Sequence, residues 1–355
     1  MNETFAARRE KVRAILRERG LDALFVSHAA NRYYLSGFEL HDCQCNESAG
    51  RLLITARGED WLCTDARYLD AAKRLWDENR IFIYRANAAE QMRDLVRYRV
   101  SGVVGIEEDC MDARFYRTFT EGLRVEAACD VVPSLRVIKD AAEIAALEDS
   151  FALNHDLMRW IPSRCTPGRT ERELSWDIEK YFREHGAEEL AFANICAVGR
   201  NGALPHAVPG DDTVTENCPV LVDVGCRLNG YCSDQTRTFW VGDSPAPEFL
   251  KTRSIVQRAQ RAAMSVMRPG VRMCDVYRAA CDVFEKEGVL SHLTHGLGHG
   301  VGLETHEAPS LNSRADAVLR EGMVVTVEPG LYYPEWGGVR WEHTVVVEAD
   351  GIRVL

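Results

Sequence analysis

Four carboxylates in the second half of the sequence have the spacing of a cation-binding site. Asp223 and Glu328 each lie at or near the end of a strongly apolar run, and each is followed closely by a glycine. A carboxylate inside an apolar strand loses its hydration, so it needs a cation or hydrogen bonds. Asp234 and Glu342 follow in extended segments downstream. The pattern therefore predicts acids that converge on a bound cation.

A hairpin signal relates the first two acids. Asn229-Gly230 between two extended runs is typical of a type I′ turn. Folding the chain on that turn makes Asp223 and Asp234 diagonal neighbours on one face, roughly 7–8 Å apart between backbones. The alternatives are that Asp223 caps its strand or pairs with Arg237, and that Asp234 is an ordinary turn residue.

The last acid lies in a segment whose faces alternate. In Arg-Trp-Glu-His-Thr-Val, a period of two places Arg340, Glu342 and Thr344 on one face. His343 falls on the opposite face. We expect Glu342 to face the cleft and His343 to point away from it.

A glycine-rich segment supplies the histidines His295, His299 and His306. It lacks the lysine and the ending of a phosphate-binding P-loop, and it does not fit the dinucleotide-binding spacing. Glycines here let the backbone approach a crowded site while imidazoles are presented to it. One histidine alone would be read as structural, but three beside four acids indicate a site.

An internal repeat positions these residues. Pro167-Gly168 and Pro269-Gly270 each precede a helical segment, and the two segments share the spacing to a phenylalanine and to a final glycine: Phe182 and Gly186, Phe284 and Gly288. A histidine-bearing loop and an acid-ending strand follow each helix. The repeat predicts two helix-plus-hairpin units around a shared cleft. The alternative is coincidence, because Pro-Gly often precedes a helix.

The rest of the chain predicts a second domain. Apolar runs alternate with helical segments, which indicates an α/β domain with a mainly parallel sheet over residues 1–135; the expected strands are residues 21–26, 51–55, 81–84 and 103–106. Residues 31–38 are expected to form an aromatic loop that could line a cleft. Pro133-Ser134 interrupts the pattern, and Asp140 with Glu143 forms a capping box that opens the domain with the acids and histidines, residues 136–355.

Composition limits the possible partners and compartment. The chain has 355 residues and a formal net charge of −11, without a cluster of Lys and Arg, which argues against nucleic acid. We find no signal-peptide pattern and no membrane-spanning run of about 18 apolar residues. Twelve scattered cysteines predict reduced thiols in a cytoplasm. Cys43 and Cys45 form a C-x-C pair, read either as weak evidence for a metal or redox pair or as two loop thiols.

The ordered set Asp223, Asp234, His299, Glu328 and Glu342, within Val-Asp-Val-Gly, Ser-Asp-Gln-Thr-Arg, His-Gly-Leu-Gly-His-Gly, Val-Glu-Pro-Gly and Arg-Trp-Glu, resembles the ligand series of the pita-bread metallopeptidases (M24). The preceding domain resembles the creatinase-type N-terminal domain of the Xaa-Pro aminopeptidase and prolidase group. The resemblance implies an α/β N-terminal domain and a pseudo-two-fold catalytic domain. One departure is His343, where the family commonly has an acid or an amide.

The resemblance also implies roles for further residues. Glu328 would be the general base, His206 and His306 would contact substrate, His295 would support the ligands, and Arg340 would belong to the substrate pocket. Four carboxylates and one imidazole suit Mn²⁺ or Co²⁺, with Zn²⁺ and Fe²⁺ as alternatives. Two such ions about 3.5–4 Å apart turn a bridging water into hydroxide near neutral pH.

The expected reaction is hydrolysis of the Xaa-Pro bond, either in dipeptides or at the N-terminus of longer peptides. Two alternatives remain: a relative that cleaves a C–N or C–S bond of a small metabolite, and a binding module without catalysis. We also expect a homodimer with no membrane or nucleic-acid partner.

Overall fold

The computed structural model describes residues 2–42, 44 and 47–355, and the chain divides into two compact units, Met1–Arg136 and Val137–Leu355. Each unit has its own buried hydrophobic core. Cys43 and Cys45, the expected C-x-C pair, lie outside the described residues. Among the described helices, none is both long enough and apolar enough to cross a membrane.

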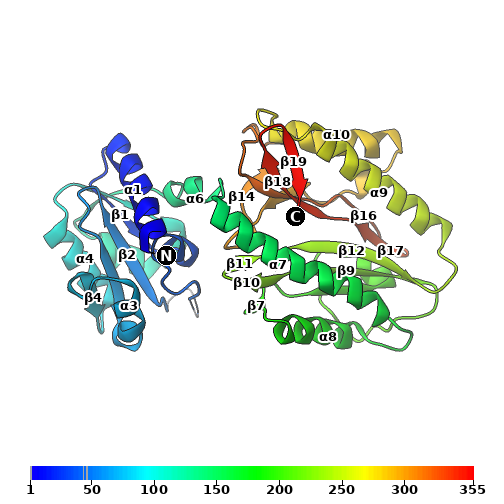
Figure 1. Ribbon diagram of the computed structural model, residues 1–355, viewed down its shortest axis with the longest axis horizontal. Helices are drawn as coiled ribbons and strands as arrows, with labels where there is room; N and C mark the ends of the chain where they lie inside the picture. Colours follow the sequence, from blue (N-terminus) through cyan, green and yellow to red (C-terminus); the bar gives the residue numbers. More distant parts are fainter. Residues whose placement is uncertain (1, 43, 45–46) are drawn as a thin grey trace. The chain divides into compact units, whose positions relative to one another are not determined.

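The N-terminal unit is a mixed sheet in the order β4-β3-β2-β1-β5-β6 with helices around it (Figure 1). Its elements are α1 (Asn2–Arg19), β1 (Ala23–Val26), α2 (Ala29–Ser36), β2 (Gly50–Thr55), β3 (Trp61–Asp65), α3 (Leu69–Leu75), β4 (Ile81–Tyr84), α4 (Ala88–Arg99), β5 (Val103–Ile106), α5 (Ala113–Thr120), β6 (Arg124–Ala127) and α6 (Val131–Arg136). The four expected strands are present. The pairs β1–β5, β5–β6 and β3–β4 are parallel, but β2 is antiparallel to both β1 and β3.

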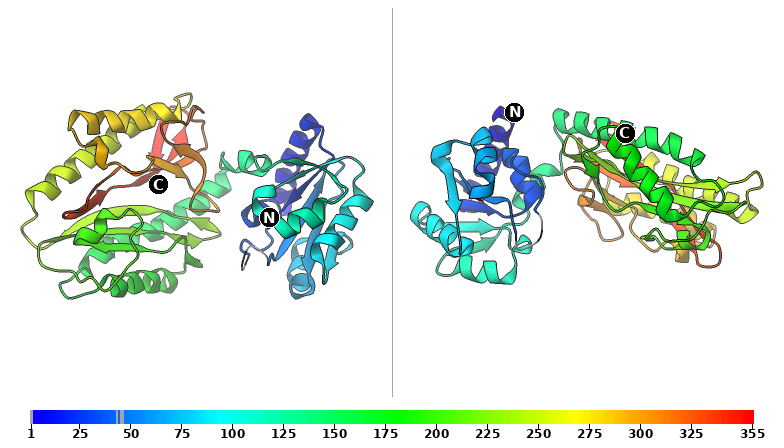
Figure 2. Two further views of the ribbon diagram at one scale, coloured as in Figure 1. Left: turned by 180° about the vertical axis from the view of Figure 1, so that it is seen from behind. Right: turned by 90° about the horizontal axis from the view of Figure 1, so that it is seen from below.

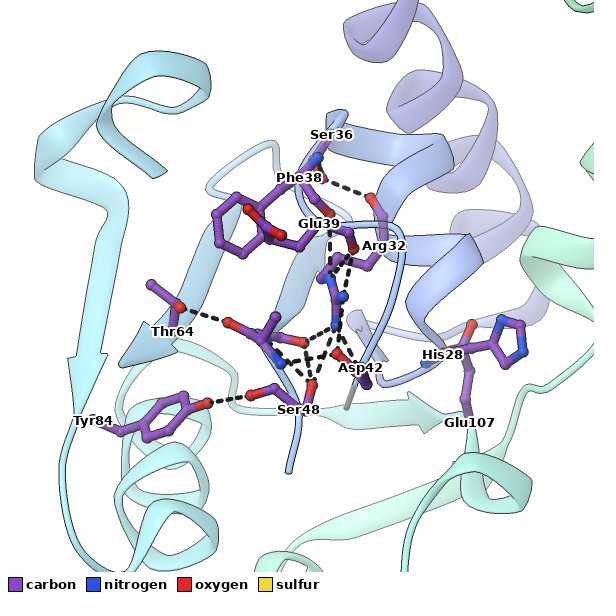
Figure 3. Close-up of polar contacts among 12 residues, drawn as sticks. His28, Arg32, Ser36, Phe38, Glu39, Asp42, Ser48, Thr64, Tyr84 and Glu107 are labelled. Atoms are coloured by element: carbon purple, nitrogen blue, oxygen red, sulfur yellow. Dashed lines mark hydrogen bonds and ion pairs between the residues drawn. The ribbon is translucent and has the colours of Figure 1, made fainter. Parts of the chain in front are cut away.

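The prediction of an aromatic loop at residues 31–38 is wrong, because most of this segment forms α2, which ends at Ser36 and is capped by Gly37 with φ 72°. Arg32 from this helix is fully buried, and its Nη1 donates to the Gly50 carbonyl at 2.6 Å. Its Nη2 pairs with Asp42 Oδ1 at 3.0 Å, and Figure 3 shows the guanidinium directed toward Asp42 and Ser48. These long-range contacts hold the helix inside the N-terminal unit, and no local sequence pattern reveals them.

Pro133-Ser134, expected to interrupt the pattern of strands and helices, lies within helix α6. Pro133 lies in the first turn of α6, where a missing backbone N–H costs no helical hydrogen bond. The capping box of Asp140 and Glu143 is present at the start of the next helix, as predicted.

The C-terminal unit contains strands between helices (Figures 1 and 2). Its elements are α7 (Ala141–Trp160), α8 (Glu171–Glu184), β7 (Glu189–Leu190), β8 (Ile195–Val198), β9 (Cys218–Val224), β10 (Cys226–Leu228), β11 (Tyr231–Cys232), β12 (Gln235–Val241), α9 (Pro247–Val266), α10 (Met273–Lys286), β13 (Gly298–Gly300), β14 (Glu307–Leu311), β15 (Val324–Val327), β16 (Gly330–Tyr333), β17 (Gly337–Arg340), β18 (His343–Glu348) and β19 (Gly351–Val354). The main sheets run β12-β9-β8 and β14-β13-β15-β18-β19. In Figure 1, α8 and α10 lie on opposite sides of these strands.

The predicted repeat is present in the backbone. Helices α8 and α10 each have 14 residues and begin at equivalent positions. The glycines before them, Gly168 and Gly270, have φ values of 90° and 87°. Their amides donate to the carbonyls of Val214 and Leu319 at 2.8 and 2.9 Å. We refer to residues 141–241 as the first half of this unit and to residues 247–354 as the second half.

Candidate metal centre

The hairpin places the two aspartates as predicted. Asn229 and Gly230 have φ values of 52° and 78°, as a type I′ turn requires. The register continues from the turn into β12, where Thr236 lies opposite Asp223. Asp234 precedes Thr236 by two residues and therefore lies diagonally across from Asp223. Both aspartates are buried, with exposed fractions of 8% and 5%.

The expected alternative partner of Asp223 is not used. Arg237 lies opposite Val222, one position along the strand, so its side chain leaves from the other face. Its guanidinium donates to the Glu342 carbonyl. Asp223 instead pairs with Arg340, whose Nη2 lies 2.6 Å from Asp223 Oδ2.

The second half supplies His299 from β13, Glu328 directly after β15 and Glu342 before β18. His299 Nε2 lies 3.1 Å from Glu328 Oε1 and 3.6 Å from Asp234 Oδ2. Thr326 joins two of these residues: its hydroxyl accepts from the His299 amide at 3.0 Å and donates to Glu328 Oε1 at 3.1 Å. Thr326 could not be singled out from the sequence, because it looks like one more β-branched residue in an apolar strand.

The buried acids are poorly stabilised without a cation. Oxygens of Asp223, Asp234 and Glu342 all lie within 4.8 Å of one another. Burial raises the pKa of each carboxyl, and neighbouring carboxylates raise each pKa further. Asp223 Oδ1 and Glu342 Oε1 are buried and have no hydrogen-bond partner among the described residues. Closely spaced hard oxygens with unused lone pairs fit a divalent cation.

His306 lies beside this cluster and lines the cleft. Its ring packs edge-on against the His299 ring, with centroids 4.2 Å apart. Ring nitrogens of both histidines and an oxygen of Asp234 come within 4.8 Å of one another, so distance alone also permits His306 as a ligand. Burial and then the neighbouring His299 lower the pKa of His306. A neutral imidazole can donate one hydrogen bond to a substrate.

Arg340, Tyr332 and His295 form a buried chain behind Asp223. Arg340 Nη1 donates to the Tyr332 hydroxyl at 2.7 Å, and that hydroxyl lies 2.8 Å from His295 Nε2. His295 Nδ1 lies 2.7 Å from the Gly296 carbonyl, so Nδ1 carries the proton and Tyr332 donates to Nε2. No sequence pattern points to Tyr332, which lies in an apolar run.

The cleft has a volume of about 680 Å³ and is lined by both halves. His206, Asp223 and Asp234 come from the first half, and His295, His299, His306, Glu328 and Arg340 come from the second half. Glu342 lies behind this wall, fully buried, and accepts a hydrogen bond from Thr236 Oγ1 at 2.9 Å.

His343 lies away from the cleft lining, next to Arg237 and His155. Burial and then these two neighbours lower the pKa of His343 to about 4. It pairs across the sheet with Val327, and β18 begins at this residue.

Comparisons with known proteins agree with this architecture. Residues 145–349 match the model of metallopeptidase family M24, and residues 8–140 match the creatinase/prolidase N-terminal domain. The chain is 32% identical to the uncharacterized peptidase YqhT of Bacillus subtilis, with 98% of this chain and 96% of the relative covered. It is 31% identical to an Xaa-Pro dipeptidase of Pyrococcus furiosus, with 98% and 97% covered.

A solved structure shows the same fold along nearly the whole chain. The Xaa-Pro dipeptidase from Bacillus anthracis superposes with a TM-score of 0.91 at 30% identity, covering 99% of this chain and 97% of that one. The family match covers more than half of the chain, and both domains are in the expected order. This protein therefore belongs to metallopeptidase family M24 and carries a creatinase/prolidase N-terminal domain.

Proposed function

We propose that this metallopeptidase hydrolyses the Xaa-Pro bond of dipeptides or of short peptides, with two divalent cations bound by Asp223, Asp234, His299, Glu328 and Glu342. The observation that carries the proposal is the buried group of carboxylates with two unpartnered oxygens beside the cleft. Relatives and solved structures that cover nearly the whole chain are named Xaa-Pro dipeptidases, which supports the substrate class.

The donor set supports Mn²⁺ or Co²⁺, because oxygens outnumber nitrogens and no described thiolate takes part. When bound, these ions would polarise the scissile carbonyl and lower the pKa of a water molecule. The domain assignment, residues 1–135 and 136–355, belongs to the same proposal, and the division into compact units supports it.

Glu328 is the proposed proton acceptor. Its burial favours the neutral carboxyl, but His299, His295 and Arg340 outweigh burial and hold the pKa of Glu328 at about 2. The carboxylate is therefore ionised near neutral pH and can take a proton at its oxygen. Thr326 fixes its orientation through a hydrogen bond to Oε1.

His206 and His306 are the proposed substrate-side donors. Both line the cleft, from different halves, so they can reach a bound peptide from two sides. Donors aimed at charge that develops during the reaction stabilise the transition state. Arg340 is almost wholly buried and committed to Asp223 and Tyr332, so its proposed role is to orient the ligand Asp223.

The test is a cleavage assay with Mn²⁺ and Co²⁺ supplied separately. We expect Leu-Pro to be cleaved, with Leu-Ala and Pro-Leu left intact, and the rates for Leu-Pro and Leu-Pro-Gly to separate a dipeptidase from an aminopeptidase. Asp234→Asn is the matched inactive control, because it removes a buried charge at nearly constant volume. A metal-loaded protein that cleaves no Xaa-Pro peptide would refute the proposal.

A further inference from the structure

Glu171, at the start of α8, is a fully buried carboxylate outside the metal centre. Its Oε1 accepts from the Val198 amide at 2.7 Å, and its Oε2 accepts from the Gly210 amide at 2.8 Å. The Asn201 side-chain amide donates to both oxygens, at 2.9 and 2.8 Å. One carboxylate therefore ties together both ends of the segment between residues 198 and 210.

That segment carries His206. In the described part of the chain, the His206 ring has no hydrogen-bond or ion-pair partner, although it lines the cleft. Its position is therefore set by the backbone of its own loop. Successive turns run from Asn201 to Leu204 and from Leu204 to Ala207. Asn201, which is bound to Glu171, is therefore connected through these two turns to the backbone beside His206.

The loop has other supports as well. Arg340 Nη1 donates to the Pro205 carbonyl at 3.2 Å. Backbone packs directly on backbone where the loop meets β17, because a Cβ at Gly338 would collide with the Gly202 carbonyl and a Cβ at Gly337 would collide with the Gly199 carbonyl. These contacts hold the middle and the underside of the loop, whereas Glu171 fixes its two ends.

The repeat shows that the fold itself does not need this acid. Helix α10 occupies the equivalent place in the second half, and its first residue, Met273, is 2% exposed. The flanking backbone bonds match: the Glu171 amide donates to Asp212, and the Met273 amide donates to Ala317. An apolar side chain therefore fills the same position where the neighbouring loop needs no carboxylate.

We propose that Glu171 is a positioning residue for His206, holding the loop at residues 198–210 so that the imidazole faces the reacting peptide. This inference rests on the proposed function of His206. A carboxylate is required because each hydrogen-bond partner of its two oxygens is an N–H donor. Charge-assisted bonds of this kind are stronger than neutral ones, and the N-terminus of α8 favours an anion.

The test uses Glu171→Met, which introduces the residue of the second half, and Glu171→Gln, which keeps the volume but turns an amide group toward backbone donors. We expect kcat to fall about 10–100-fold in Glu171→Met, since displacement of a reacting group by about 1 Å costs on this order. Glu171→Gln should lose less. Glu173→Gln, on the exposed side of the same helix, is the control and should keep full activity.

A double-mutant cycle with His206→Ala separates positioning from general structural damage. If Glu171 acts through His206, the double variant Glu171→Met/His206→Ala should be about as slow as His206→Ala alone. Multiplicative losses would overturn the inference. Metal content should stay native in all variants, and KM should change less than kcat.

A readout without turnover completes the test. Amide hydrogen exchange of peptides covering residues 199–210 should speed up in Glu171→Met and, less strongly, in Glu171→Gln, with residues 295–306 unchanged. Unchanged exchange in the loop would also overturn the inference. Failure of the proposed function would look different, because the wild-type protein itself would cleave no Xaa-Pro peptide.

Discussion

His299 and His306 are close neighbours, yet we assign His299 to the metal and His306 to the substrate, and replacing each with alanine tests this division. His299 Nε2 approaches both Glu328 and Asp234, so its loss removes a direct donor. Loss of residues that merely orient ligands costs about 10–100-fold in metal affinity, and loss of a ligand should cost more. His306→Ala should leave the metal bound.

The expected kinetic loss in His306→Ala follows from its place in the cleft. A neutral imidazole that donates to developing charge contributes about 10²–10³ in turnover, or roughly 2.7–4 kcal/mol of barrier. Its pKa is lowered by burial and by His299, so it stays neutral at working pH. The loss should therefore appear in kcat at full metal occupancy.

The assay combines metal analysis by mass spectrometry after dialysis with kcat on Leu-Pro. His185→Ala, at the exposed end of α8, controls for removal of a histidine elsewhere. Metal loss in His306→Ala would show that His306 is itself a ligand, together with Asp234 and His299. Our division of roles would then be wrong.

Three further substitutions and one metal titration have defined outcomes. Glu328→Gln should reduce kcat more than tenfold, because the amide cannot accept a proton, and retention of a tenth of the activity would contradict its role as the base. His343→Asp should keep near-native metal content, since this side chain contacts Arg237 and His155, and marked metal loss in mass spectrometry would reverse the strand-face assignment. Tyr332→Phe leaves His295 Nε2 without its buried donor and should lower the free energy of unfolding by about 1–3 kcal/mol, measured by denaturant titration, with an unchanged midpoint as the contrary result. Saturation with a divalent ion at a hundredfold excess over its Kd should stabilise the apo protein by about 2.7 kcal/mol, and a melting temperature insensitive to Mn²⁺ and Co²⁺ would count against a metal site.

Local signals in the sequence predicted the parts of the site that depend on short-range geometry. Asn229-Gly230 fixed the hairpin register, and the register brought Asp223 and Asp234 together because strand faces alternate every residue. The repeat predicted a second helix at an equivalent position, and α8 and α10 have equal lengths.

Residues whose importance depends on distant partners were not predictable. Tyr332 looks like a core aromatic until the fold places Arg340 and His295 on its hydroxyl. Glu171 looks like an ordinary acid in a first helical turn, because its donors lie 27 to 39 residues further along the chain. Arg32 is a similar case. Its guanidinium is held by the Gly50 carbonyl of the next strand, a contact that only the fold reveals, so the helix around Arg32 was not expected.

The glycine contacts beneath the His206 loop constrain how substrate preference can diverge. A Cβ at Gly338 would collide with the Gly202 carbonyl oxygen, so a side chain at Gly338 must displace backbone, whereas a Cβ at Gly202 would make only ordinary contacts. Leu204 and Val208, in the same loop, are 56% and 82% exposed, and Val208 lines the cleft. Variation during selection for new peptides should therefore accumulate at these two exposed positions, whereas Gly338 stays fixed because its close contact with Gly202 supports the loop that carries His206.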